Sequence, residues 1–180
     1  MTCQVSEASG RQNLLCLTAD NELQEGRVTE AGNASEGLKK LHERGYNLVV
    51  LDINLPGRSG LDLLKDIKHL KPDLKVLMIS MYPEEQYAIR SLKSGASGYL
   101  IKESAPDELT IAVEKILKGH RYITQSIAER IFDSVNTAKL PHQSLSNREL
   151  EVLIMIAKGK GLKEIGNLLS LSKKTISTYR

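Results

Sequence analysis

The sequence contains few of the residues that hold metals or form disulfides. Its 180 residues include two cysteines, Cys3 and Cys16, whose spacing fits no metal site, and four scattered histidines to which we assign no function. No apolar run approaches the length of a membrane span, and the polar N-terminus shows no signal peptide. These absences predict a cytoplasmic protein with no membrane partner, in which both cysteines are plain thiols.

Three short apolar runs each lead to a polar side chain. Short apolar runs bounded by turn residues are typical of buried parallel strands, and segments of helical periodicity separate these three. The alternation predicts an α/β fold in which a doubly wound parallel sheet brings the three polar side chains to one edge. The runs and their polar residues are 48–51 with Asp52, 75–79 with Ser80, and 98–101 with Lys102.

Asp52 stands at the position where ligands usually bind in an open α/β sheet. Ligands in such folds sit outside the carboxyl ends of the strands, and a carboxylate there is a candidate nucleophile or metal ligand. A purely structural interpretation stays open, since a single aspartate at this point can also cap a helix or lie in a loop. The serine and the lysine at the neighbouring strand ends favour the functional interpretation.

The strands and the segments around them resemble a known family. VTEAGNASEGL, LVVLDINLPGRSGLDLLKDIK and VLMISMYPEEQYAIRSLKSGASGYLIKESAPDEL are similar to the receiver domain of two-component response regulators of the NarL/FixJ family. The resemblance runs from about Val28 to the C-terminus. It implies a flavodoxin-like (CheY-like) receiver, incomplete at its N-terminus, followed by a small all-α helix-turn-helix domain. It also implies a chain truncated at both ends.

The resemblance assigns roles to the polar residues at the strand ends. Asp52 would be the phosphoacceptor, and the backbone carbonyl of Asn54 would bind Mg²⁺. Ser80 would hydrogen-bond the phosphoryl oxygens, Lys102 would pair with their charge, and Tyr99 resembles the aromatic switch that swings inward. These residue types suit the chemistry, because a phosphoaspartate adds about two negative charges that need a cation and hydroxyl donors. For Tyr99, a half-buried strand aromatic is an alternative interpretation.

The N-terminus lacks the pair of adjacent acids that response regulators carry at the end of their first strand. In one alignment, residues 13–18 form that strand and Asp20 is the remaining acid. Only eight residues then precede the next strand, and a parallel crossover needs about a dozen or more. We therefore favour the other alignment, in which residues 11–23 take the place of the first helix, the first strand lies within residues 1–6, and the acidic pair falls near Glu7.

Either alignment predicts a weak magnesium site. Mg²⁺ is the cofactor that the resemblance implies, and it is usually held by several oxygen ligands that include carboxylates. Here Asp52, the Asn54 carbonyl and one further acid, Glu7 or Asp20, are left to hold it. Because a site that loses charge holds a hard cation less firmly, magnesium-dependent phosphorylation is predicted to be weak or absent.

A polar linker separates this domain from a second one. The sequence predicts a short helix at 124–132, whereas residues 134–144 show no periodic pattern. We therefore place the receiver at 1–122, a short helix and linker at 123–144, and the second domain at 145–180.

The second domain opens with a capping box. Ser146 and Glu149 are three residues apart, so the serine side chain can accept from the first turn of a helix while the glutamate side chain reaches back to the serine backbone. The periodicity of that helix predicts a buried stripe made of Leu150, Leu153, Ile154 and Ala157.

Two more helices complete a helix-turn-helix pattern. They are predicted at 162–169 and from Lys173 onward, and the segment LSNRELEVLIMIAKGKGLKEIGNLLSLSKKTISTYR resembles the LuxR-type output domain. The resemblance makes residues 173–180 the start of the recognition helix, with Ile176 and Tyr179 facing the core; the alternative is a solvated charged face. The residues left for the groove and the phosphates are Lys173, Lys174, Thr175, Ser177, Thr178 and Arg180.

Charge follows the same division. Residues 139–180 carry eight basic and three acidic residues, a net charge of +5, whereas residues 1–138 have a net charge of −2. The basic end is therefore where double-stranded DNA is expected to bind.

We carry three functional hypotheses. The first is a transcription regulator, not an enzyme, that a sensor histidine kinase controls through Asp52 and that the resemblance allows to form a homodimer. The second is an atypical or inactive receiver that acts through protein contacts without phosphorylation or productive DNA binding. The third, a phosphatase with an aspartyl-phosphate at Asp52, is disfavoured because Asn54 is no general acid.

Overall fold

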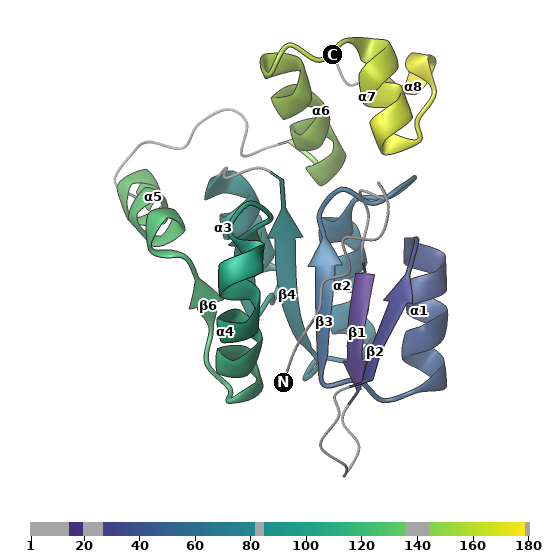
Figure 1. The fold of residues 1–180 in the computed structure, drawn as a ribbon. Helices are drawn as coiled ribbons and strands as arrows, with labels where there is room; N and C mark the ends of the chain where they lie inside the picture. The colour runs from purple at the N-terminus through teal and green to yellow at the C-terminus, as the bar shows by residue number, and fades with distance from the viewer. Residues whose placement is uncertain (1–14, 20–26, 82–84, 136–144, 179–180) are drawn as a thin grey trace.

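The described part of the chain forms one six-stranded sheet with helices on both faces and three further helices beyond its upper edge (Figure 1). The computed structural model describes residues 15–19, 27–81, 85–135 and 145–178. The strand order is β2-β1-β3-β4-β5-β6. The strands are β1 Leu15–Ala19, β2 Arg27–Ala31, β3 Leu48–Asp52, β4 Lys75–Ser80, β5 Gly98–Ile101 and β6 Tyr122–Ile123.

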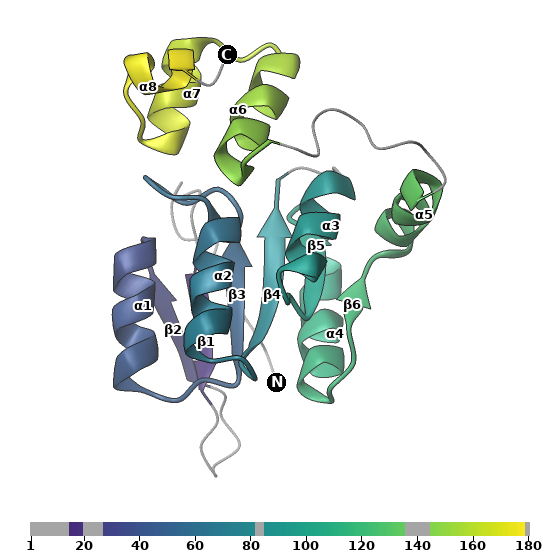
Figure 2. The same ribbon diagram turned by 180° about the vertical axis from the view of Figure 1, so that it is seen from behind.

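Helices cover both faces of the sheet, which is why β3 is apolar from Leu48 to Leu51 and β4 from Val76 to Ile79. In Figure 2 α1 and α2 lie in front of the sheet, and α4 lies in front in Figure 1. One core cluster joins the sheet to α1, α2 and α3, and a second joins it to α4. The helices of this domain are α1 Ala34–Glu43, α2 Gly60–Leu70, α3 Glu85–Lys93 and α4 Ala105–Leu117.

The doubly wound sheet predicted from the sequence is confirmed, with one strand reversed. β3, β4, β5 and β6 pair in parallel, whereas β1 lies between β2 and β3 and runs antiparallel to both. β2 is therefore parallel to β3, and β1 is the one strand of the described sheet that runs the other way.

The reversed strand overturns our favoured alignment of the N-terminus. Residues 15–19 form a strand, so a helix over 11–23 is wrong, and the expected strand at 1–6 lies outside the described residues. The disfavoured alignment had the right segment but the wrong direction. An antiparallel hairpin needs only a short connection, so our objection that eight residues are too few for a crossover does not apply.

The segment after α4 adds a strand that the sequence analysis missed. β6, Tyr122–Ile123, pairs with Gly98 and Tyr99 of β5, so the sheet extends just past our expected boundary at residue 122. The helix expected at 124–132 is α5, Gln125–Val135, which packs on α3. Ile127 is buried in the core of the sheet domain, so α5 belongs structurally to that domain.

Three helices make up the second domain: α6 Asn147–Ala157, α7 Leu162–Leu169 and α8 Lys173–Thr178. The capping box of Ser146 and Glu149 is present, as the sequence predicts. The predicted buried stripe is partly wrong, because Leu153 is 43% exposed and Ala157 is exposed, whereas Val152 and Met155 are buried. Among the described residues, no helix is long and apolar enough to cross a membrane.

α6 buries two faces against different neighbours, which explains the error. Leu150 lies in the core cluster of the sheet domain, and the partly buried Ile154 packs against that cluster. Val152 and Met155 instead share a cluster with Ile165 and other apolar residues of α7 and α8. A single-stripe pattern assumes one buried face, so it could not find both.

Candidate functional site

Asp52 ends β3 with its carboxylate buried and held by two donors. The ammonium of Lys102 lies 2.5 Å from Asp52 Oδ2, and the backbone N–H of Asn54 donates to Oδ1 at 3.0 Å. The Asp52 residue is fully buried, while about a fifth of the Lys102 side chain is exposed (21%). A carboxylate with a cation and a backbone amide in contact is a preorganised anionic site.

Ser80 lies on the neighbouring strand at the same edge. In the parallel pairing of β3 with β4, Asp52 is opposite Ile79, the residue before Ser80, and the Ile53 amide donates to the Ile79 carbonyl at 3.0 Å. The Lys102 amide in turn donates to the Ser80 carbonyl at 2.8 Å, and Ser80 is fully buried. The three strand ends therefore meet as the sequence predicts.

Burial and the lysine act on the Asp52 carboxyl in opposite directions. Burial raises the pKa of Asp52 and is the larger effect, while the charge of Lys102 and its hydrogen bond lower it. The result is a pKa above the ordinary value for aspartate. Lys102 therefore offsets only part of the free-energy cost of keeping this carboxylate charged away from water.

A tight loop connects Asp52 to α2 and depends on one glycine. The Gly60 amide donates to the Ile53 carbonyl at 2.7 Å, and the Ser59 side chain caps α2 by accepting from the Leu61 amide. A Cβ on Gly60 would lie 2.0 Å from the Asp52 carbonyl oxygen. Only glycine fits at residue 60 without moving the strand end that carries Asp52.

Tyr99 is more buried than our alternative interpretation, a half-buried strand aromatic, predicts. It is fully buried in β5, opposite Met78 of β4 and Ile123 of β6. β4 separates it from β3, but the core cluster that contains Tyr99 also contains Tyr87 and Ile53, so Tyr99 belongs to the same packed unit as the loop after Asp52. Asn54 is the residue expected to give its carbonyl to a cation. It lies two residues after Asp52 and pairs with Ser59 in an isolated bridge.

The described residues do not fit a conventional magnesium site. The two carboxylate oxygens of Asp52 are engaged by Lys102 and Asn54, and no group of three or more His, Cys, Asp or Glu side chains occurs in the described part of the chain. β1 runs antiparallel, so its carboxyl end at Ala19 lies at the opposite edge of the sheet from Asp52. Asp20 and Glu7 lie outside the described residues.

The helix predicted to contact DNA is present as α8. Ser172 caps it by accepting from the Thr175 amide, Ile176 is buried against α7, and Lys174 is exposed. Lys173, Ser177 and Thr178 belong to the helical backbone, whereas Arg180 and Tyr179 lie outside the described residues. The burial of Ile176 agrees with its predicted place toward the core of the domain.

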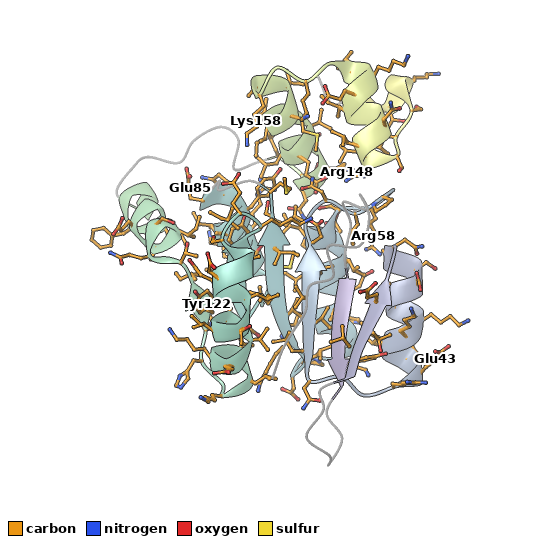
Figure 3. All side chains as sticks on the ribbon, viewed as in Figure 1. Glu43, Arg58, Glu85, Tyr122, Arg148 and Lys158 are labelled. Carbon is orange, nitrogen blue, oxygen red and sulfur yellow. The ribbon has the colours of Figure 1, made fainter. Side chains whose placement is uncertain are left out.

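Sequence reasoning missed the contacts between the two domains. Ser59 donates to the buried carboxylate of Glu151, which also pairs with Arg148 at 2.5 Å. Arg148 lies at the end of α6 that faces the sheet, and Lys158 lies at the far end (Figure 3). The one available signal was an oppositely charged pair, Arg148 and Glu151, three residues apart inside an apolar helix.

The end of α7 is held by the same contact region. The Leu169 carbonyl accepts from the Gly57 amide at 3.1 Å and from the Arg148 guanidinium at 2.9 Å. The last carbonyls of a helix have no donor within the helix, and here the Gly57 amide and the Arg148 guanidinium act as donors to one of them. The loop after Asp52 thus contacts both α6 and α7.

Comparisons with known proteins divide the chain in the same way. Residues 12–114 match the response regulator receiver domain, and residues 143–180 match the LuxR family of bacterial regulatory proteins.

Individual relatives align with most of the chain. The chain is 33% identical over 156 residues to the response regulator UvrY of Escherichia coli K12, covering 85% of this chain and 72% of UvrY. A structure of RcsB from Salmonella enterica serovar Typhimurium, bound to a promoter with a phosphomimetic, has a TM-score of 0.53 and 26% identity, covering 83% of this chain and 72% of RcsB. A structure of two RcsB dimers on two parallel DNAs has a TM-score of 0.54, 25% identity and the same coverage.

Proposed function

Because this chain belongs to the response regulators that join a receiver domain to a LuxR-type DNA-binding domain, we propose that it is a transcription regulator controlled by phosphorylation of Asp52. The observation that carries the proposal is the meeting of Asp52, Ser80 and Lys102 at adjacent strand ends, with the Lys102 ammonium 2.5 Å from Asp52 Oδ2. The proposed phosphodonor is a sensor histidine kinase.

The chemistry requires Asp52 to act as a nucleophile. One carboxylate oxygen attacks phosphorus, a P–O or P–N bond to the donor breaks, and the donor group leaves with the bonding electrons. The product is an acyl phosphate that carries about two negative charges. Lys102 would pair with the new phosphoryl oxygens, and the Ser80 hydroxyl would donate a hydrogen bond to them.

The reaction is proposed without a step that passes through a metal ion. Mg²⁺ is general to receiver domains, but Lys102 already holds Asp52, and the described residues contain no group of three or more His, Cys, Asp or Glu side chains. Lys102 supplies positive charge where a cation otherwise would. Glu7 and Asp20, the two further acids proposed as ligands, belong to parts of the chain that the structure does not describe.

Tyr99 is proposed to respond to the phosphorylated state. Its ring is buried in the strand that lies beside Ser80 and ends one residue before Lys102. Movement of either residue toward a phosphoryl group would change the packing around Tyr99. Because packed cores change between discrete arrangements, a small shift there can be passed to the surface of α3.

DNA binding is proposed for α8. Lys174 is exposed near its start, the C-terminal domain carries a net positive charge, and the related RcsB is seen bound to DNA. We propose that Lys173, Lys174, Thr175, Ser177, Thr178 and Arg180 provide the groove and phosphate contacts. By analogy with the RcsB dimers on DNA, we propose that the chain acts as a homodimer.

The test of phosphorylation is intact mass after incubation with acetyl phosphate, with Mg²⁺ or with EDTA. We expect a phosphoryl adduct on the wild type and none on Asp52→Asn. Asp66→Asn, an equivalent change at an exposed ion pair with Arg58, is the matched control and should be labelled like the wild type. No adduct on folded wild-type protein in either buffer would overturn the proposal.

DNA binding is tested by fluorescence anisotropy with a mixed-sequence duplex, because the operator is unknown. Removing one phosphate contact with Lys174→Ala should weaken binding and reduce the salt slope by about one. Lys39→Ala, an exposed lysine on α1, should leave both unchanged. Equal effects of the two substitutions would contradict the assignment of α8.

A second candidate function is a receiver that works without phosphorylation. The poor fit of the described residues to magnesium favours it, since a receiver that cannot hold the cation can still pass information through protein contacts. The two tests separate the candidates, because this one expects neither a phosphoryl adduct nor productive binding to DNA.

A further inference from the structure

Asn147 joins two helices of the receiver domain from the first turn of α6. Its amide nitrogen donates to Asp62 Oδ1 at 2.8 Å, and its amide oxygen accepts from Arg90 Nη1 at 3.0 Å. Asp62 belongs to α2 and Arg90 to α3. Asn147 is 8% exposed, and both hydrogen bonds are partly buried.

The chemistry of the two partners fixes the orientation of the amide. An ionised carboxylate only accepts hydrogen bonds and a guanidinium only donates them, so the –NH₂ group must face Asp62 and the oxygen must face Arg90. Both bonds involve a charged partner, and such bonds are stronger than those between neutral groups. An aspartate at residue 147 would keep the bond to Arg90 but would face Asp62 with a second negative charge.

The two helices that Asn147 joins both follow strands whose carboxyl ends form the edge that carries Asp52 and Ser80. α2 begins directly after the loop that follows Asp52, and α3 follows β4, which ends at Ser80. A change in the spacing of α2 and α3 must therefore break one of the two bonds. The Gly57 amide, which donates to the Leu169 carbonyl of α7, lies in that same loop.

We propose that Asn147 is a two-point clamp that holds the DNA-binding domain on the receiver only while α2 and α3 keep their present spacing. The docked position of the domain then reports the state of the edge that carries Asp52 and Ser80, and docking and any change at that edge are coupled reciprocally. The clamp is a property of the unmodified protein, and it exists whether or not the chain is ever phosphorylated at Asp52.

The test is hydrogen exchange of the Gly57 amide, whose partner lies in the other domain. We expect Asn147→Asp to speed its exchange about tenfold, which corresponds to about 1.4 kcal/mol of docking free energy. Adding Asp62→Asn to this variant removes the new repulsion and should return exchange to within about twofold of the wild type. Asn47→Asp, the same chemical change at an exposed position before β3, is the matched control and should have no effect.

The variant is not expected to unfold α6, since an acidic residue in the first turn of a helix is favourable. The Lys158 amide, bonded to the Ile154 carbonyl at the far end of α6, checks this and should keep its wild-type exchange rate. Arg90→Gln changes only the receiver side and should also speed exchange of Gly57. Unchanged exchange in Asn147→Asp or in Arg90→Gln, or failure of Asp62→Asn to restore protection, would overturn the clamp.

Discussion

The inner and outer strands of the sheet are built differently. β3 and β4 are buried on both faces and deliver Asp52 and Ser80 to the functional edge, whereas β2 at the sheet margin leaves Val28 43% exposed and Glu30 exposed. β1, between them, runs against its neighbours without changing the parallel register of β3 with β4. The candidate site therefore lies on the part of the sheet that packing constrains most, and the reversed strand lies in the other part.

Glycine substitutions at the upper edge of the sheet should show the largest difference between the inner and outer strands. Gly60→Ala, beside Asp52, forces a Cβ to within 2.0 Å of a backbone oxygen and should lower the free energy of unfolding by about 3 kcal/mol or more. Gly32→Ala follows β2 at the same edge, where the nearest atom is 3.7 Å away, and should change it by about 0.5 kcal/mol or less. Urea denaturation measures the free energy of unfolding of both variants. Similar losses in the two would mean that the ends of the inner and outer strands are equally constrained.

Truncating one valine on each side gives a smaller difference. Val76 in β4 is fully buried, so Val76→Ala removes buried methyl groups and leaves a cavity, at a cost of about 2 kcal/mol. Val28→Ala on β2 removes groups that water already reaches and should cost about 0.5 kcal/mol or less. Urea midpoints at a constant m-value report the two losses, and a loss at Val28 as large as that at Val76 would contradict the comparison.

The same contrast explains what the sequence could predict. The inner strands were found because each is a local apolar run with turn residues behind it, and parallel strands bring their carboxyl ends together whatever else the chain does. The segment around β1 is also apolar, so its existence as a strand was within reach. Its direction was not, because direction depends on which strands it pairs with and not on its own residues.

The contacts between domains were out of reach for a similar reason. Ser59 and Glu151 are 92 residues apart, and Asn147 and Asp62 are 85 apart. Nothing in the pattern of either segment says that they meet, since each is also consistent with a capping or solvated polar residue. Leu153 was placed in the core wrongly because the two buried faces of α6 follow from its position between two partners.

The charge of Asp52 itself should cost stability. Asp52→Asn keeps the shape of the side chain, removes a buried charge, and leaves Lys102 partly exposed to water, so the free energy of unfolding should rise by about 1 kcal/mol at neutral pH. Asp66→Asn, at an exposed ion pair, should change it by about 0.5 kcal/mol or less. A clear loss of stability in Asp52→Asn would show that Lys102 more than offsets the cost of burial.

The pH dependence of that difference is the smallest effect and the most specific. Because burial raises the pKa of Asp52 above its ordinary value of 3.8, the folded state holds the proton more tightly than the unfolded state. The wild-type free energy of unfolding should therefore fall as pH rises from about 3.8 through the raised pKa, and Asp52→Asn should lack this contribution. Urea denaturation of both proteins from pH 4 to 8 measures the difference between their free energies of unfolding. The contributions of other groups, such as Glu151, cancel to first order in this difference. The difference should grow with pH and then level off, whereas a difference that stays constant or shrinks would mean that the Lys102 pair, and not burial, controls this carboxyl.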